Sequence, residues 1–172
     1  MGKENETSRT VQRLFDLHGT LKRKSEKIKN ELLRDMFNVN VRNPLKFRYV
    51  LMDSGFASQE TFEHILKHKK HFVAPLKNNR LVALSLEDKK EGRFVHVNEL
   101  ELSDKQAVRG YLKGFNQEAL WFCRLFKNKE GSTGRLDLVC SDLMCNGEQV
   151  ATIYEKRWQV EEYHKLHHHY TK

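Results

Sequence analysis

The sequence predicts an α/β protein in which a parallel strand pair precedes an antiparallel β region. Three observations predict this class. Residues 47–76 read as strand, helix and strand, residues 81–141 contain five short apolar runs separated by turn residues, and helical spacing begins again near Gly147. With 172 residues, the chain is long enough for one domain that carries an inserted subdomain.

The first part of the chain is charged and then helical. Residues 1–27 are polar, and we expect them to be poorly ordered. Residues 28–172 form the predicted domain. From Lys27 to about Val41 apolar residues recur at helical spacing, which predicts an amphipathic helix. Pro44 ends it, because the residue before a proline disfavours helical backbone.

A short strand is predicted to deliver an aspartate at its carboxyl end. The segment 47–53, FRYVLMD, is aromatic and β-branched and runs into the turn residues Ser54 and Gly55. A helix should follow, since Ser58 is a suitable N-cap, and residues 71–76 then read as a second strand. Strand, helix and strand in this order are typical of a parallel layer, with Asp53 at the end of its first strand.

Residues 80–142 have the pattern of an antiparallel β insertion. The predicted strands are 81–86, 93–100, 107–115, 120–126 and 135–141. Glycine-containing turns separate several of them, at Glu91-Gly92 and at residues 129–134. A last helix should then run from about Gly147 towards the carboxyl terminus.

Composition narrows the location and the partners. Hydrophobic residues make up 38% and charged residues 31% of the chain. No apolar run approaches the roughly 20 residues that cross a bilayer, and no secretory signal core is present, so we expect a cytoplasmic protein without a membrane partner. Cys123, Cys140 and Cys145 lack CxxC spacing and are interpreted as reduced thiols. The net charge of +8 favours nucleic acid as a partner, although a solvated basic surface explains it equally well.

The last helix carries a polar stripe. Four residues fall at offsets 0, 3, 7 and 11, which places them within an arc of about 80° on a helix: Tyr154, Arg157, Glu161 and Lys165. Ile153 and Val160 make a neighbouring apolar edge that could dock onto a sheet. Taken alone, this pattern is also that of a solvated helix face with charge pairs four residues apart.

The spacing of this stripe resembles a family signature. Tyrosine, arginine, glutamate and a downstream lysine, within YEKRWQVEEYHK, resemble the Tyr-Arg-Glu-Lys signature of bacterial insertion-sequence transposases of the DDE class. Upstream, YVLMDSGFAS and FVAPLKNNR resemble the segment around the second catalytic aspartate of that group. The resemblance covers residues 25–165.

The resemblance implies a partial RNase H-like core, with the antiparallel insertion between Asp53 and the glutamate helix. It further implies that Asp53 and Glu161 bind Mg²⁺ or Mn²⁺, and hard cations of this kind prefer oxygen ligands. Two such ions can activate a nucleophile and stabilise the leaving oxygen in DNA cleavage and strand transfer. The expected partner is double-stranded DNA at transposon ends, bound by a homodimer in the bacterial nucleoid.

The resemblance also implies the DNA contacts. Arg157 and Lys165 would bind phosphate, and Tyr154 would bind or stack on a DNA end. Lys77 and Arg80, in the basic turn after the second strand, are further candidates, though such a turn is as often only solvated.

Two departures from the family pattern affect the expected activity. The lysine that the family carries seven residues after its glutamate is replaced by His168, so Lys165 either substitutes for it or the contact is weakened. Only 52 residues precede Asp53, and the candidates for the first aspartate, Asp16 and Asp35, lie on no buried strand pattern. We therefore expect a truncated transposase. The alternatives are a non-catalytic fragment that binds DNA or transposase subunits, and an inactive relic.

Two other groups of residues have weaker interpretations. His64 and His68 are four residues apart on a predicted helix, with Glu60 in the same row, which allows a zinc site but favours a solvated face. Asp137 and Asp142 lie near a strand end just before the last helix. Asp142 is a minor alternative to the assigned carboxylates.

Overall fold

The computed structural model describes residues 28–43, 46–127 and 130–169, with side chains described up to residue 160. The predicted state of residues 1–27 lies outside the described residues, and so does Asp16. Within the described part, the α/β class predicted from the sequence is confirmed.

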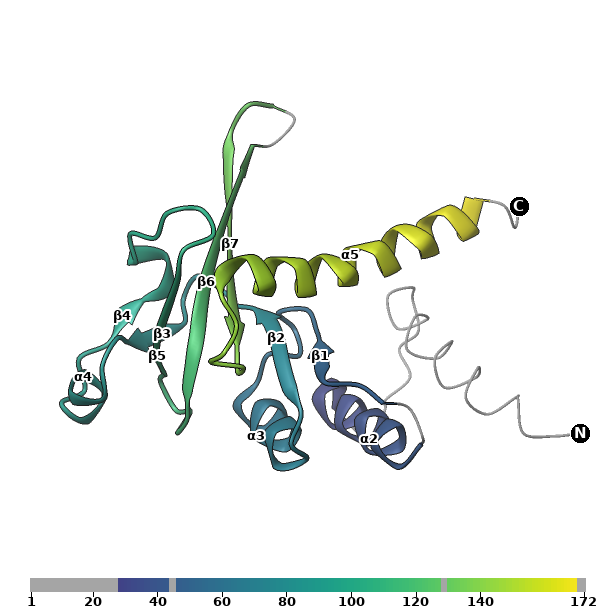
Figure 1. Cartoon of the computed structure of the whole chain (residues 1–172), viewed down its shortest axis with the longest axis horizontal. Helices are drawn as coiled ribbons and strands as arrows, with labels where there is room; N and C mark the ends of the chain where they lie inside the picture. Colours follow the sequence, from purple (N-terminus) through teal and green to yellow (C-terminus); the bar gives the residue numbers. More distant parts are fainter. Residues whose placement is uncertain (1–27, 44–45, 128–129, 170–172) are drawn as a thin grey trace, which may run out of the picture.

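Seven strands form one mixed sheet, in the order β1-β2-β7-β6-β5-β3-β4 (Figure 1). The strands are β1 (Tyr49–Leu51), β2 (His71–Pro75), β3 (Leu81–Ala83), β4 (Val95–His96), β5 (Ala107–Leu112), β6 (Glu118–Lys127) and β7 (Thr133–Cys140). The α-helices of the described residues are α2 (Lys29–Arg42), α3 (Gln59–Lys67), α4 (Leu86–Lys90) and α5 (Gly147–His169).

β1 and β2 are the parallel pair that the sequence predicts, with Val50 opposite Phe72. The helix α3 connects them and begins after Ser58, whose hydroxyl oxygen accepts a hydrogen bond from the Thr61 amide at 3.3 Å. The strand β1 is shorter than predicted, because only three residues of 47–53 pair in the sheet.

The two faces of the sheet have separate hydrophobic cores. Val50 and Phe72 pack in the core that includes residues of α2 and α3, whereas Tyr49 and Val73, one position away along each strand, pack in the core that includes α5. This alternation is what a pleated strand produces. The sheet therefore lies between α2 and α3 on one side and α5 on the other.

The antiparallel region is not a separate unit, because its last strand returns to the parallel pair. β7 pairs with β2 in antiparallel register, with Cys140 opposite Val73 and Leu138 opposite Pro75. The antiparallel pairing predicted for residues 80–142 is confirmed, and these strands extend one continuous sheet. The far halves of β6 and β7 pair with each other beyond the ends of β5 and β2, as an arm that rises from the molecule (Figure 1).

Two of the predicted strands are largely wrong. Of residues 81–86, only Leu81–Ala83 pair as a strand, because Ser85 caps the short helix α4 by accepting a hydrogen bond from the Asp88 amide at 3.0 Å. Of residues 93–100, only Val95 and His96 form a strand, and a 3-10 turn over Val97–Glu99 follows.

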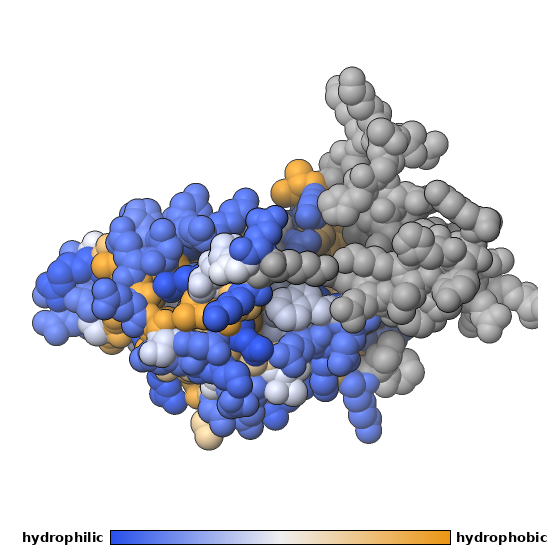
Figure 2. All heavy atoms as spheres, turned by 90° about the horizontal axis from the view of Figure 1, so that it is seen from above, coloured by the Kyte–Doolittle hydropathy of each residue, from blue (hydrophilic) through white to orange (hydrophobic). Residues whose placement is uncertain are grey.

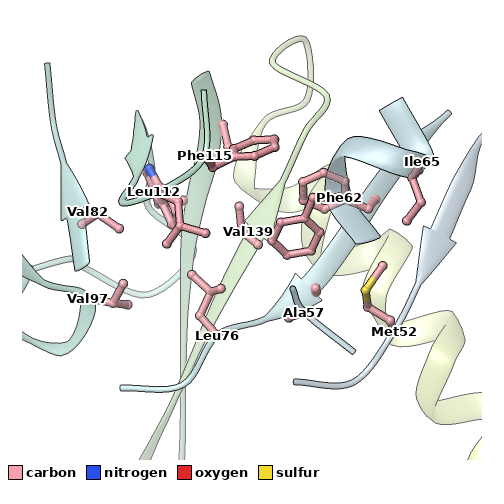
Figure 3. Packing of buried hydrophobic residues seen from close by; sticks show 14 of the residues in the cluster. Met52, Ala57, Phe62, Ile65, Leu76, Val82, Val97, Leu112, Phe115 and Val139 are labelled. Carbon is pink, nitrogen blue, oxygen red and sulfur yellow. The ribbon is translucent and has the colours of Figure 1, made fainter. Parts of the chain in front are cut away.

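Aromatic residues join the strands to α3 in the larger core (Figure 3). The rings of Phe62 on α3 and Phe72 on β2 stack with centroids 4.0 Å apart, and Phe115 contacts both edge-on. Leu76 and Val139 continue the core towards the antiparallel strands (Figure 3). The parallel pair is thus packed against the rest of the sheet.

The face of the molecule seen in Figure 2 is mainly hydrophilic, with hydrophobic residues visible between the hydrophilic ones. The described residues contain no helix that is both long and apolar enough to cross a membrane. Cys123, Cys140 and Cys145 are all free thiols, as the sequence predicts.

Candidate active site

Asp53 lies just beyond the carboxyl end of β1. Its Oδ1 accepts a hydrogen bond from the Gly55 amide at 2.7 Å, and this turn fixes the start of the side chain. The Nζ of Lys29, on the first turn of α2, is 3.9 Å from the same oxygen. Because the carboxylate is 40% exposed, it is open to a ligand from solvent.

The basic turn that contains Lys77 and Arg80 lies at the corresponding end of β2. Lys77 is exposed, whereas Arg80 is half-buried and donates a hydrogen bond from Nη2 to the carbonyl of Ala57 at 2.7 Å. Ala57 belongs to the loop that follows Asp53. The aspartate and the basic turn therefore lie at the same end of the sheet, where both parallel strands finish, as expected for strands that run in the same direction.

The polar stripe of α5 begins against the sheet. Tyr154 is only 3% exposed and packs with Val150 and Ala151 in the core beneath α5. Arg157 is half-buried, and its guanidinium carbon lies 5.7 Å from the centroid of the Tyr154 ring. Tyr154 is buried in this core. Its contact with DNA stays a prediction, and that contact requires the ring or the hydroxyl group to become exposed.

The apolar edge predicted for α5 is partly wrong. Ile153 is partly buried against the core beneath α5, beside Val150, Ala151 and Tyr154, whereas Val160 is 56% exposed. The reason is the direction of the helix: α5 crosses the sheet and then extends past β1 (Figure 1), so that residues beyond Tyr154 have less sheet beneath them.

Glu161 and Lys165 lie on the last turns of α5, where the backbone is helical as predicted. Their side chains fall outside the described part of the structure, and so does that of His168. Their roles as metal ligand and phosphate contact stay predictions.

The histidine pair on α3 is packed rather than fully solvated. His64 Nε2 is 2.7 Å from Asn38 Oδ1, and His68 Nδ1 is 2.9 Å from the His64 carbonyl oxygen. Both rings meet Phe37 edge-on. Among the described residues, no group of three or more histidine, cysteine or acidic side chains could hold a metal ion, so the structure does not support a zinc site here. The solvated face is also wrong in part, because both histidine rings pack against Phe37.

Asp137 and Asp142 are buried but do not join Asp53. The Asp137 carboxylate accepts a hydrogen bond from Arg135 Nη2 at 2.8 Å. Arg135 also donates hydrogen bonds to the carbonyl oxygens of Val97 and Leu100. Asp142 follows the end of β7 and contacts Tyr49, at the opposite end of β1 from Asp53. Four residues of extended chain separate Tyr49 from Asp53, about 13 Å, so Asp142 is not an alternative partner for Asp53.

Comparison with known families places these residues in a known domain. The family model described as the transposase DDE domain matches residues 15–170, and the chain belongs to this family. No curated protein matches the chain. The chain is therefore derived from a transposase, and its function is related to DNA transposition and to interaction with DNA. Members of this family usually use a divalent metal ion.

Proposed function

We propose that the chain supplies Asp53 and Glu161 to the active site of a bacterial insertion-sequence transposase, which cleaves and transfers DNA strands at the ends of the element. The observation that carries this proposal is the position of Asp53, an accessible carboxylate at the carboxyl end of a parallel strand pair, beside a basic turn. Membership of the transposase DDE domain family gives the reaction class.

The alternation of β1 favours a shared space for the two carboxylates. Tyr49 and Leu51 face the core beneath α5, and Asp53 continues this alternation by one further step. Position 161 follows Tyr154 by seven residues, which is about 20° around the helix axis and about 10 Å further along it. Position 161 therefore falls on the side of the sheet that α5 covers, while the Asp53 carboxylate lies at the end of β1, where Lys29 of α2 also reaches it.

The donor set fits a hard divalent cation. Asp53 offers carboxylate oxygens in a half-exposed setting, and Glu161 would add another carboxylate from α5. These two residues would hold Mg²⁺ or Mn²⁺, which would polarise the phosphate and favour deprotonation of a nucleophile. The Gly55 amide keeps the Asp53 carboxylate oriented, and Lys29 Nζ lies 3.9 Å from the same oxygen.

Cations near this edge would bind the DNA backbone. Lys77 is exposed, and Arg80 uses one terminal nitrogen for the Ala57 carbonyl, which leaves other N–H groups of its guanidinium for phosphate. Arg157 and Lys165 would contact phosphate from α5. The proposal includes double-stranded transposon ends as the DNA, a homodimer in the complex, and the nucleoid of a bacterial cytoplasm as the location.

The family pattern requires one more aspartate. Among the described residues no group of three or more histidine, cysteine or acidic side chains could hold a metal ion, so we infer that this aspartate comes from outside them. β1 has only β2 as a partner among the described strands, so its second edge is open to a further strand that would lie beside Asp53.

The test is a DNA joining assay on a plasmid that carries the genomic DNA from both sides of the gene. With Mn²⁺ or Mg²⁺, the chain should nick or join the element ends, and Asp53→Ala or Glu161→Ala should abolish this. Glu63→Ala, an exposed carboxylate on α3, is the matched control and should keep activity. Activity unchanged by both site substitutions would rule out the proposed carboxylates.

The second candidate function is a non-catalytic fragment that binds DNA or transposase subunits. The open edge of β1 favours it, because unpaired strand edges accept strands from other polypeptides. Salt-sensitive DNA binding without metal-dependent joining would support this function. Strand transfer by the isolated chain would exclude it.

A further inference from the structure

A buried carboxylate connects the start of β1 to the turn that leads into α5. The Asp142 side chain is 4% exposed, and its Oδ2 accepts hydrogen bonds from the Tyr49 hydroxyl and from Arg48 Nη2, both at 2.7 Å. Its Oδ1 accepts a third hydrogen bond from the Met144 amide at 3.1 Å. Arg48 and Tyr49 are more than 90 residues away in sequence, so this contact joins two distant parts of the chain.

Neighbouring contacts hold the same turn to β2. Ser141 Oγ accepts a hydrogen bond from the Phe72 amide at 3.0 Å and lies 3.2 Å from His71 Nδ1. The turn between β7 and α5 is therefore fixed to the first residues of both parallel strands. We call the contacts of Asp142 with Arg48, Tyr49 and Met144 the Asp142 clamp.

The clamp is electrostatically stable at neutral pH. Burial alone would raise the pKa of Asp142, but the hydrogen bonds from Tyr49, from the Met144 amide and from Arg48 outweigh it. The pKa therefore lies below its usual value, and the carboxylate stays ionised. A buried anion with these donors has little freedom to move away from them.

The start of α5 is fixed as well. Asn146 Oδ1 accepts from the Gln149 amide and Gln149 Oε1 accepts from the Asn146 amide, both at 2.9 Å, which is a reciprocal cap. The helix then packs on the sheet through Val150, Ala151 and Tyr154, with Ile153 partly buried beside them. Glu155 is exposed but accepts a hydrogen bond from Arg124 on β6 at 3.3 Å, and the residues from Lys156 to Val160 are exposed except for Arg157. Within the described side chains, the contacts of α5 with the sheet are thus concentrated in its first turns, up to Glu155.

A small rotation of α5 at its first turns would move the far part of the helix by several ångströms. Position 161 is 14 residues from Gly147, about 21 Å along the axis, so a rotation of about 10° at the anchored end moves it by about 4 Å. Metal-holding groups must be placed far more closely than that, since a displacement of about 1 Å can cost about a hundredfold in rate. The contacts that fix the first turns of α5 therefore affect how closely Glu161 can approach Asp53.

We propose that Asp142 is a positioning residue, which sets the angle of the glutamate helix relative to the strand that ends at Asp53. The clamp contacts that strand directly, through Tyr49 at its first residue. Its connection to the reaction rests on the proposed function, whereas its effect on the helix angle does not. Asp142 acts through α5 and contacts no substrate in this role.

The test measures the helix angle directly. Gln159 on α5 and Lys67 on α3 are exposed, and each is replaced by p-acetylphenylalanine and coupled to a nitroxide, which avoids the native cysteines. Electron–electron resonance then gives the distance between the labels. Asp142→Asn should broaden or shift this distance by about 3 Å or more, and should lower DNA joining about tenfold to a hundredfold.

Asp137→Asn is the matched control, because Asp137 is an equally buried carboxylate of the same β7 region but is held by Arg135, away from α5. It should lower thermal stability and leave the distance unchanged. Arg48→Gln covers the case in which Asp142→Asn does not fold. The Arg48 side chain is 65% exposed, so its loss weakens the clamp without opening the core, and Arg42→Gln is its charge-matched control.

The outcomes separate the two proposals. An unchanged distance in Asp142→Asn and in Arg48→Gln would overturn the positioning role, and so would an equal change in Asp137→Asn. If the unsubstituted chain joins no DNA but the distance still changes in the clamp variants, the positioning role of Asp142 would be supported and the proposed DNA-joining activity would be rejected.

Discussion

The antiparallel half of the sheet and its parallel half differ in length, burial and in the contacts that hold them. β6 has ten residues, of which Ala119 to Cys123 are continuously buried, whereas β1 has three residues that are all half-buried. The start of β1 is held in addition by hydrogen bonds between side chains, in the Asp142 clamp. Asp53 thus follows the shorter and less buried of these two strands, and segments with fewer buried apolar contacts open more easily.

The largest expected difference between the halves comes from truncation of one core residue in each. Trp121 on β6 is 2% exposed, so Trp121→Ala should lower the free energy of unfolding by about 3 to 5 kcal/mol. Leu51 on β1 is half-buried, and Leu51→Ala should cost about 2 kcal/mol or less. Denaturant unfolding of both variants measures the difference, and equal losses would contradict the assignment of stability to the antiparallel half.

Close packing between strands gives the next effect. Gly110 on β5 has no room for a Cβ, which would lie 2.6 Å from the Ala83 carbonyl oxygen and 2.8 Å from Trp121 Nε1. Gly110→Ala should therefore destabilise the fold by about 1 to 3 kcal/mol. Gly134→Ala is the control, because the Cβ there meets only the ring of Phe126, which is 43% exposed and can rotate. Thermal unfolding that ranks Gly134→Ala as the more harmful would contradict this interpretation.

The parallel half should be more sensitive to alkaline pH. Burial of Tyr49, with its hydrogen bonds to Cys145 and Asp142, raises the pKa of its hydroxyl above the usual value. The unfolded chain loses this proton near pH 10, so the contribution of Tyr49 is complete below that pH and is lost as pH rises. Tyr49→Phe should remove part of this loss, at a cost of about 1 kcal/mol at neutral pH. If the free energy of unfolding of the parent chain and of Tyr49→Phe fell with the same slope from pH 9 to pH 11, this contribution of Tyr49 would be contradicted.

The helical layer should show the smallest effect, at acid pH. Burial, and then the neighbouring charge of His68, lower the pKa of His64 below its usual value. The unfolded histidine takes up its proton below about pH 6.5, so the stability due to neutral His64 is present above that pH and declines as pH falls. His64→Gln should flatten the stability curve between pH 7 and pH 5. A curve with the same slope as the parent would show that His64 is not involved.

The sequence predicted the elements whose signals are local. The Ser58 cap, the start of α5 at Gly147 and the strand before Asp53 all follow from spacing and from turn residues within a few positions. The error at residues 81–86 had a local signal as well. Ser85 and Asp88 are a serine and an acid three residues apart, which is the pattern of a helix start.

The sequence could not predict contacts between distant segments. Asp142 gains its role from Arg48 and Tyr49, which are more than 90 residues away, and no periodicity connects them. The docking face of α5 was misjudged for the same reason: Val160 is apolar, but the helix has already passed beyond the part of the sheet it packs on when it reaches that residue. Tertiary placement, rather than residue type, decided both cases.

The position of β2 between β1 and β7 has a consequence for the order of folding. Its second edge is completed by residues that lie 63 to 67 positions later in the chain, and a pairing this distant forms slowly. During synthesis, α2, β1, α3 and β2 emerge first, but a parallel pair of three and five residues is too small to persist alone. We expect the edge that carries Asp53 to assemble only after β7 and the first turns of α5 have left the ribosome, so that it is among the last parts of the molecule to form.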